Sequence, residues 1–206
     1  MKVMILDKIF EYRNDKKIID EVLKQVDKEI ADFNVMLSHF DIDGKDIYYD
    51  FYDYILDHIK EIKEIHVITK TTKEMHNEIL LSTLDYIIRA IPEIEILSNE
   101  FYKSSDGNRW NKLIDLFEGI NWIITTFIEI DSNINIQNIL GNYEKWNDYV
   151  QDVYYLKDVM KELEYIVKSN DLVSIADILS YEINSLFSNM KQKLESLLCR
   201  EEIKEC

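Results

Sequence analysis

Histidine is the side chain best suited to metal binding or proton transfer near neutral pH, and this chain contains four, His39, His58, His66 and His76. None of them completes the Glu-x-x-His pattern of a di-iron helical bundle or the His-Glu-x-x-His pattern of a zinc enzyme. His39 and His66 fall in segments that we expect to be strands, where a structural role is favoured over metal binding. The sequence therefore predicts no metal site and no cofactor.

Other catalytic signatures are also missing from the sequence. It contains no Gly-x-Ser-x-Gly elbow, no P-loop and no dinucleotide-binding glycine fingerprint. Asp41 and Asp43 begin like a calcium loop, but an EF-hand needs Gly at its sixth position and Glu at its twelfth, and Gly44 and Tyr52 do not fit. Cys199 and Cys206 lack an identifiable base, and the many carboxylates are spread like solvated helix faces. We assign no catalytic residue, and an unrecognised hydrolase remains one alternative.

The strongly acidic composition bears on the choice of partner. The net charge is −16, and both the first 70 residues and the remainder are negative. Such a chain is repelled by phosphate backbones, so we expect no nucleic-acid partner. The acidity suits either plain solubility or a basic protein partner. The sequence lacks an apolar run of about 18 residues and a signal-peptide core, which predicts a cytoplasmic protein with no membrane contact and reduced cysteines.

Short apolar runs, turn signals and one helical pattern alternate in the first 70 residues. Asp43-Gly44 is a strong hairpin signal, because a type I′ turn needs positive φ at both central positions. Between residues 16 and 34, apolar residues recur every three or four positions and predict a helix lying on a sheet. The expected strands are Lys2–Leu6 and Ile9–Tyr12, joined at Asp7-Lys8, then Val35–Ile42, Lys45–Tyr48 and, after a short helix, Ile65–Thr69.

This order of strands and helices resembles that of ubiquitin-like β-grasp domains. The resemblance covers about a third of the chain and implies a small mixed sheet. It does not bring the chemistry of the family with it, because the last strand runs on from Ile68-Thr69-Lys70 into a helix and leaves no free Gly-Gly tail for conjugation. The four cysteines of β-grasp ferredoxins are absent too. What the resemblance still implies is an exposed sheet that binds other proteins.

Tyr48, Tyr49, Phe51, Tyr52 and Tyr54 form the densest aromatic cluster of the chain. Tyrosine offers a large apolar area with a polar tip, so the cluster suits a recognition surface. The alternative is that these rings anchor the short helix to the sheet. Tyr49 and Tyr52 are the members that we expect to be exposed and to bind a partner.

The remaining residues predict an antiparallel bundle of about four helices. Four glycines and one proline are few and favour long helices. Pro92 should kink or break the first helix, which then resumes to Tyr102. Further helices are expected from 109 to 129 and from 143 to 168, separated by a polar connector from 131 to 142, and a fourth follows the short connector at 169–171. The prediction is an α+β fold with a β-grasp-like domain at 1–70 and a helical bundle domain at 71–206.

The second expected helix contains further candidates for partner binding, Trp110, Gly119 and Trp122. Glycine within a helix costs about 1 kcal/mol relative to alanine. Gly119 therefore needs a reason, either the close approach of a neighbouring helix or a bound ligand. The stretch from Trp110 to Trp122 is similar to segments of an uncharacterised family of bacterial helical proteins, a resemblance that implies no activity.

These observations favour an intracellular protein without catalytic function, an interaction, adaptor or chaperone-like module that binds a protein partner. One alternative is a small-ligand sensor with an apolar pocket near Gly119 and Trp122. The hydrolase would require converging carboxylates with shifted pKa values in a cleft. Oligomeric state does not follow from the sequence.

Overall fold

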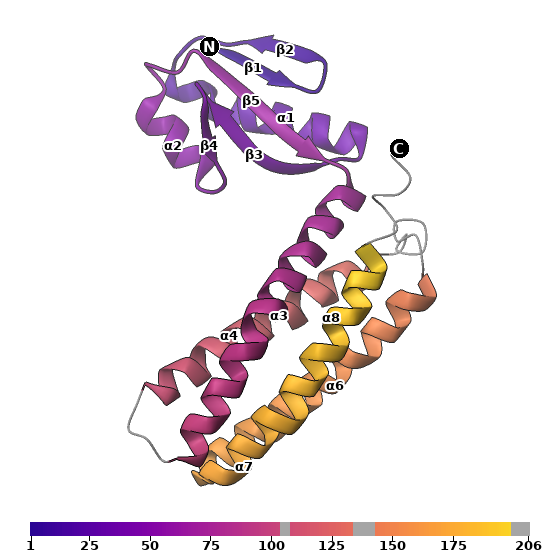
Figure 1. Cartoon of the computed structure of the whole chain (residues 1–206). Coiled ribbons are helices and arrows are strands. Elements are labelled where there is room, and N and C mark those ends of the chain that lie inside the picture. Colours follow the sequence, from indigo (N-terminus) through magenta and orange to yellow (C-terminus); the bar gives the residue numbers. More distant parts are fainter. Residues whose placement is uncertain (104–107, 134–142, 199–206) are drawn as a thin grey trace. The chain divides into compact units, whose positions relative to one another are not determined.

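The structure is a computed structural model that describes residues 1–103, 108–133 and 143–198. The chain divides into two compact units, Met1–Met75 and His76–Cys206, and each unit has its own hydrophobic core. Figure 1 shows the strands in the first unit and the long helices in the second. The predicted α+β fold class is therefore confirmed.

The first unit is built on a five-stranded mixed sheet with the order β2-β1-β5-β3-β4. β1 pairs in parallel with β5, and the other neighbours are antiparallel. All five predicted strands are present, with small shifts at their ends. They are β1 (Lys2–Ile5), β2 (Lys8–Glu11), β3 (Met36–Ile42), β4 (Lys45–Ile47) and β5 (Glu64–Lys70).

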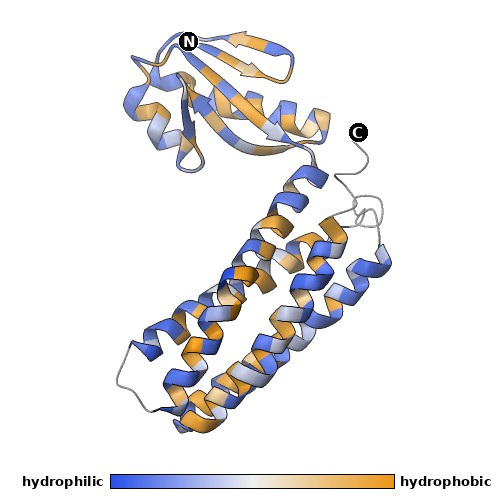
Figure 2. Ribbon diagram, in the orientation of Figure 1, coloured by the Kyte–Doolittle hydropathy of each residue, from blue (hydrophilic) through white to orange (hydrophobic). Residues whose placement is uncertain are grey.

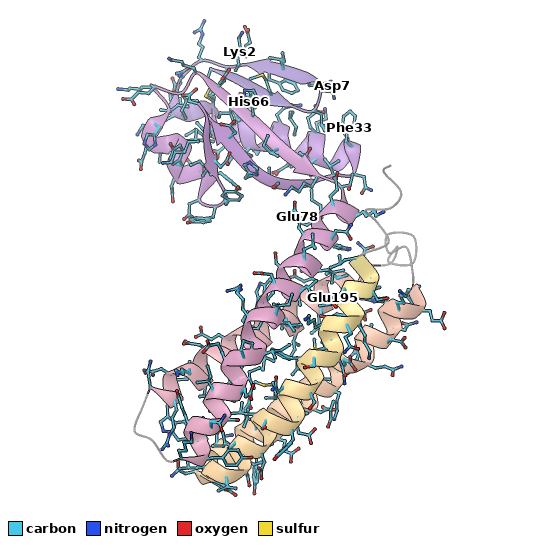
Figure 3. All side chains as sticks on the ribbon, viewed as in Figure 1. Lys2, Asp7, Phe33, His66, Glu78 and Glu195 are labelled. Atoms are coloured by element: carbon cyan, nitrogen blue, oxygen red, sulfur yellow. The ribbon has the colours of Figure 1, made fainter. Side chains whose placement is uncertain are left out.

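The first hairpin turns one residue earlier than predicted. Lys8 already pairs with Ile5 as the first residue of β2, so the turn lies at Leu6 and Asp7, and the predicted junction at Asp7-Lys8 is wrong. Figure 3 labels Asp7 at the tip of this hairpin. Leu6 has a φ of 52°, a conformation that leucine rarely adopts, and residue type therefore gave no signal for a turn here.

The second hairpin turns at Asp43-Gly44 as predicted, with φ values of 51° and 84°. The Asp41 carboxylate accepts a hydrogen bond from the Gly44 N–H at 2.8 Å. The Asp43 carboxylate accepts hydrogen bonds from the backbone N–H groups of Lys63 and Glu64. Both aspartates therefore hold the hairpin and the beginning of β5 in place.

Two helices complete the core of the first unit. α1 (Ile19–Phe33) follows a short 3₁₀ turn at Lys16–Ile18, and α2 (Phe51–His58) follows β4. The alternating apolar residues of the strands face the apolar stripe of α1, as period-two and period-3.6 patterns require. The buried core consists of Val3, Ile5, Ile19, Val22, Val26, Phe40, Ile42, Ile47, Ile55, Ile59, Ile62, Ile65 and Val67.

The second unit contains long helices that run in alternating directions (Figure 1). Their described bounds are α3 (Thr72–Tyr102), α4 (Arg109–Asp131), α6 (Tyr143–Ser169), α7 (Leu172–Asp177) and α8 (Asn184–Leu198). A π-helical segment, Ile178–Ile183, joins α7 to α8 and makes one continuous return along α6. Most of the polar connector predicted at 131–142 lies outside the described residues.

Pro92 does not break α3, which is helical from Thr72 through Tyr102, so the alternative of a break is wrong. Proline removes the backbone donor that would bond the carbonyl of Ile88, four residues earlier. Both Pro92 and Ile88 lie on the exposed side of α3, where water can solvate that carbonyl. Ile94, Leu97 and Phe101 are buried, and their packing holds the second half of the helix in the bundle.

The core of the second unit lies along one side of each helix. Figure 2 shows hydrophobic and hydrophilic residues alternating along the ribbons, as an amphipathic bundle requires. Trp146, on the predicted seam of α6, is fully buried and stacks on Phe127 with ring centroids 5.5 Å apart. Its indole N–H donates a 3.0 Å hydrogen bond to the Asp131 carboxylate, so the buried polar atom is satisfied.

Candidate partner-binding site

Three residues of the aromatic cluster, Tyr48, Tyr49 and Tyr54, line a surface pocket at the junction of β4 and α2. This β4–α2 pocket has a volume of about 420 Å³. The backbone turns at Asp50, whose φ is 54°, and both the chain leaving β4 and the first turn of α2 line the pocket. The lining residues are Lys45, Asp46, Ile47, Tyr48, Tyr49, Asp50, Asp53, Tyr54, Asp57 and His58.

Ring stacking fixes the walls of the β4–α2 pocket. Tyr48 stacks on His39 of β3 with ring centroids 4.7 Å apart, and the Nε2 atom of His39 lies 3.3 Å from the Asp46 carboxylate. Within α2, Tyr54 stacks on His58 with ring centroids 4.3 Å apart. Phe51 anchors the beginning of α2 by stacking on the buried Phe40. The same cluster thus serves both as a core anchor and as an exposed surface.

The exposed tyrosines of this surface are Tyr48, Tyr49 and Tyr52, with exposed fractions of 59%, 76% and 43%. The expectation that Tyr49 and Tyr52 are exposed agrees with the structure. Tyr49 lines the β4–α2 pocket, whereas Tyr52 lies outside it on α2. Their role in binding stays a prediction.

The pocket is acidic. Asp46, Asp50, Asp53 and Asp57 face a single lysine, Lys45, whose ammonium group lies 4.9 Å from the centre of the Tyr54 ring. Within the described part of the chain, Asp50, Asp53 and Asp57 have no ion-pair partner. Tyrosine rings next to unpaired carboxylates favour a cationic group, which would gain both ion pairing and cation–π attraction.

The other three predicted residues all lie on α4. Trp110 and Trp122 are partly exposed, at 36% and 40%. Trp110 makes an edge-to-face contact with Phe101, and the Arg109 guanidinium lies over both rings. Twelve residues separate the two tryptophans, about 18 Å along a helix, so they do not form one cluster.

Gly119 lies where α4 meets a tyrosine of α3. A Cβ atom placed on Gly119 would lie 1.9 Å from the hydroxyl oxygen of Tyr86 and 2.2 Å from its Cζ atom. Tyr86 in turn packs edge-to-face against Phe187 of α8. The Tyr86 ring therefore occupies the space that a side chain at position 119 would need. Of the two reasons expected for a glycine here, the close approach of a neighbouring helix is the one that the structure shows.

A second pocket lies next to Tyr86, between α3 and α4. This α3–α4 pocket has a volume of about 260 Å³ and an apolar floor with charged residues at its rim. Gly119 supports the tyrosine at its wall, but neither Trp122 nor Trp110 lines it. The lining residues are Tyr86, Arg89, Ala90, Glu93, Ile94, Leu97, Lys112, Asp115 and Leu116.

Within the described residues, the carboxyl groups with shifted pKa values all have lowered ones. Hydrogen bonds from Lys8 and from the Thr71 backbone lower the pKa of Glu29 and Glu74. Lys161 and Ser174 lower the pKa of Asp158 and Asp171 in the same way. A general acid at neutral pH needs a raised pKa, so these four groups give the hydrolase alternative no support.

The described residues contain neither a cluster of metal ligands nor a helix that could cross a membrane. Across residues 1–103, 108–133 and 143–198, no three His, Cys, Asp or Glu side chains gather closely enough to hold a metal ion. In the same ranges, no helix combines the length and the apolar character that a membrane crossing requires. Cys206 and Cys199 lie outside these ranges.

Sequence reasoning missed several residues of both pockets. The sequence places Tyr48 in the aromatic cluster but does not mark it as exposed, and nothing local separates Asp53 and Asp57 from the other surface carboxylates. Their spacing of four places them on one side of α2, which was the available signal. The contact between Tyr86 and Gly119 joins residues 33 positions apart, and no local pattern reveals it.

Comparison with known families gives two matches. Residues 1–71 match a family described as the TP0873 N-terminal domain, and residues 78–193 match one described as a domain of unknown function, DUF8042. No curated protein and no solved structure matches the chain. Since the second match covers more than half of the sequence, the chain belongs to the DUF8042 family.

Proposed function

We propose that this protein is a non-catalytic interaction module that binds a basic segment of a protein partner at its β4–α2 pocket. The observation that supports the proposal best is the combination of exposed tyrosines with unpaired aspartates in one pocket. Tyr49 would lie against the aliphatic part of a lysine or arginine side chain, while Asp53 and Asp57 receive its charged end. Tyr52 would extend the contact along α2.

The architecture supports a recognition role for the first unit. We propose that residues 1–70 form a β-grasp domain and that residues 71–206 form a separate bundle domain. The strand order β2-β1-β5-β3-β4, with β1 parallel to β5 and α1 against one face, supports the first part. Two separate hydrophobic cores support the second. In an adaptor, the bundle would offer Trp110 and Trp122 to a further contact.

The test uses capture of partners from native lysate by the whole chain, followed by quantitative mass spectrometry. We expect at least one protein whose recovery falls about tenfold or more with Tyr49→Ala, because a central aromatic anchor contributes about 2 kcal/mol or more. Tyr165→Ala is the matched control, since Tyr165 is exposed to the same fraction, 76%, on α6. Equal recovery with both variants would contradict the proposal.

The charge part of the proposal has its own control. Asp53→Asn combined with Asp57→Asn should weaken capture of the same protein and reduce the dependence of capture on salt. Asp20→Asn combined with Asp27→Asn makes the same change in net charge at two exposed positions of α1. If both double variants behave alike, the partner responds to net charge and not to the pocket.

The α3–α4 pocket favours a second candidate function, the binding of a small ligand by the helical unit. Its apolar floor and charged rim are typical of small-molecule sites, although its volume of about 260 Å³ is slightly smaller than theirs usually is. A cavity of about 150 Å³ can hold a benzene ring, so this pocket has room for a somewhat larger body.

The cytoplasmic location and the absence of a nucleic-acid partner remain predictions from composition.

A further inference from the structure

The α3–α4 pocket contains charged residues of both signs, but they are not equivalent. The Arg89 guanidinium is paired with Asp85 of the same helix through contacts of 3.1 Å. Lys112 is paired with Glu100. Both cations at the rim are therefore already neutralised by carboxylates that do not line the pocket.

The two carboxylates at the rim are left without such partners. Glu93 of α3 and Asp115 of α4 make no ion pair with any residue in the described ranges. The four charged residues of the rim and the two partner carboxylates together carry a net charge of −2. An entering cation would meet two carboxylates that have no ion-pair partner, whereas an anion would meet only cations that already have one.

The apolar residues of the pocket indicate what the uncharged part of a ligand should be. Ala90, Ile94, Leu97 and Leu116 provide an apolar floor, and Ala90 leaves space because its side chain is short. The ring of Tyr86 forms a wall, supported from behind by Phe187. Burying an apolar body against this floor removes its surface from water, which favours binding.

We infer that the α3–α4 pocket binds a small amphipathic amine, with its apolar body on the floor and its ammonium group between Glu93 and Asp115. The inference rests on the second candidate function, ligand binding by the helical unit, and specifies the chemistry of that ligand. A body of one aromatic ring with a two-carbon chain to the ammonium group fits a volume of about 260 Å³.

The test compares three probes of the same shape with the whole chain, by ligand-observed NMR titration. 2-Phenylethylamine carries the ammonium group, 3-phenylpropionate carries a carboxylate, and propylbenzene is neutral. We expect saturable binding of the amine, and binding of the other two that is weaker by about tenfold or more, which corresponds to the loss of one charged hydrogen bond. Added salt should weaken the binding of the amine but not the binding of the other two probes.

Matched variants locate the binding site. Glu93→Gln and Asp115→Asn should each reduce the affinity for 2-phenylethylamine, while Glu95→Gln and Glu118→Gln, exposed neighbours on the same two helices that do not line the pocket, should leave it unchanged. Circular dichroism of each variant checks that the helices are retained. Equal loss in all four variants, or no loss in any, would overturn the inference.

The probes also separate two kinds of failure. If propylbenzene or 3-phenylpropionate binds as well as the amine, the inferred amine chemistry is wrong while ligand binding itself stands. If none of the three probes binds saturably, both the amine inference and the second candidate function fail. The partner-binding proposal at Tyr49 depends on neither outcome, because its residues belong to the other unit.

Discussion

At the scale of residues, three of the four buried polar residues in the described ranges, Glu29, Thr83 and Ser98, have hydrogen-bond partners. Thr83 and Ser98 lie in α3 and donate to the carbonyls of Ile79 and Glu95. Glu29 is 3% exposed and accepts hydrogen bonds from Lys8 and Gln25. Each of these groups has a partner on its own helix or on the adjacent hairpin, which is the usual condition for burial.

His76 departs from this rule. It is 6% exposed, and within the described residues its Nδ1 atom has no hydrogen-bond partner. Burial lowers the pKa of His76 below its usual value of 6.5, because the charged imidazolium is poorly solvated. The folded protein therefore holds His76 neutral at a pH where the unfolded chain already binds a proton.

We predict that His76 makes the protein less stable in mild acid. The unfolded state binds more protons than the folded state once the pH falls below about 6.5, so the free energy of unfolding must fall with the pH, by at most about 1.4 kcal/mol per pH unit. Urea unfolding of the wild type at pH 7.5 and 5.5 measures the loss. His76→Leu has no proton to bind and should lose less stability over the same interval. An identical loss in both proteins would show that other groups cause it.

At the scale of elements, the apolar period was sufficient to place most helices and strands. Val3 and Ile5 alternate with outward residues in β1, and the heptad-like spacing of α6 placed Trp146 and Leu163 in the core. The π-helical segment was not predicted, because Ile175, Leu179 and Ile183 are spaced by four and fit an ordinary α-helix as well. The segment Ile178–Ile183 contacts α6, and its i→i+5 hydrogen bonding leaves no mark in the apolar spacing.

The pockets were the least predictable features for a related reason. The β4–α2 pocket depends on the left-handed conformation of Asp50 and on the stacking of Tyr48, which directly follows β4, on His39 of β3. The cluster of tyrosines is visible in the sequence. The sequence does not show which of the many surface carboxylates lie next to these tyrosines and would favour a cationic partner. A site that combines elements is determined by tertiary contacts.

The packing of α3 on α4 gives a prediction for Gly119. Alanine at a helix interior position is normally favoured over glycine by about 1 kcal/mol. Here the new Cβ atom would meet the Tyr86 ring, and overpacking costs about 1–3 kcal/mol. We therefore expect Gly119→Ala to lower the free energy of unfolding in urea by about 1 kcal/mol.

A double-mutant cycle identifies the cause. In a Tyr86→Ala background the obstacle is absent, so Gly119→Ala should be neutral or stabilising by up to about 1 kcal/mol. If Gly119→Ala destabilises both backgrounds equally, the glycine is required for a reason other than the Tyr86 ring.

At the scale of the whole molecule, each unit has the means to fold around its own core. Ile65 is fully buried in the first unit and Leu163 in the second, and they belong to separate hydrophobic clusters. The three tryptophans, Trp110, Trp122 and Trp146, all belong to the helical unit. Tryptophan fluorescence therefore reports the unfolding of that unit, while hydrogen exchange of β1 and β5 amides reports the sheet.

The proposed division into two domains predicts that these two signals separate. Ile65→Ala should destabilise the sheet by about 2–5 kcal/mol, because it leaves a cavity in a close-packed core. It should lower the protection of the strand amides while the fluorescence midpoint in urea stays unchanged. Leu163→Ala should do the reverse. If either substitution shifts both signals by the same free energy, the chain unfolds as one cooperative unit, and the two cores, although separate in space, are not separate domains in the thermodynamic sense.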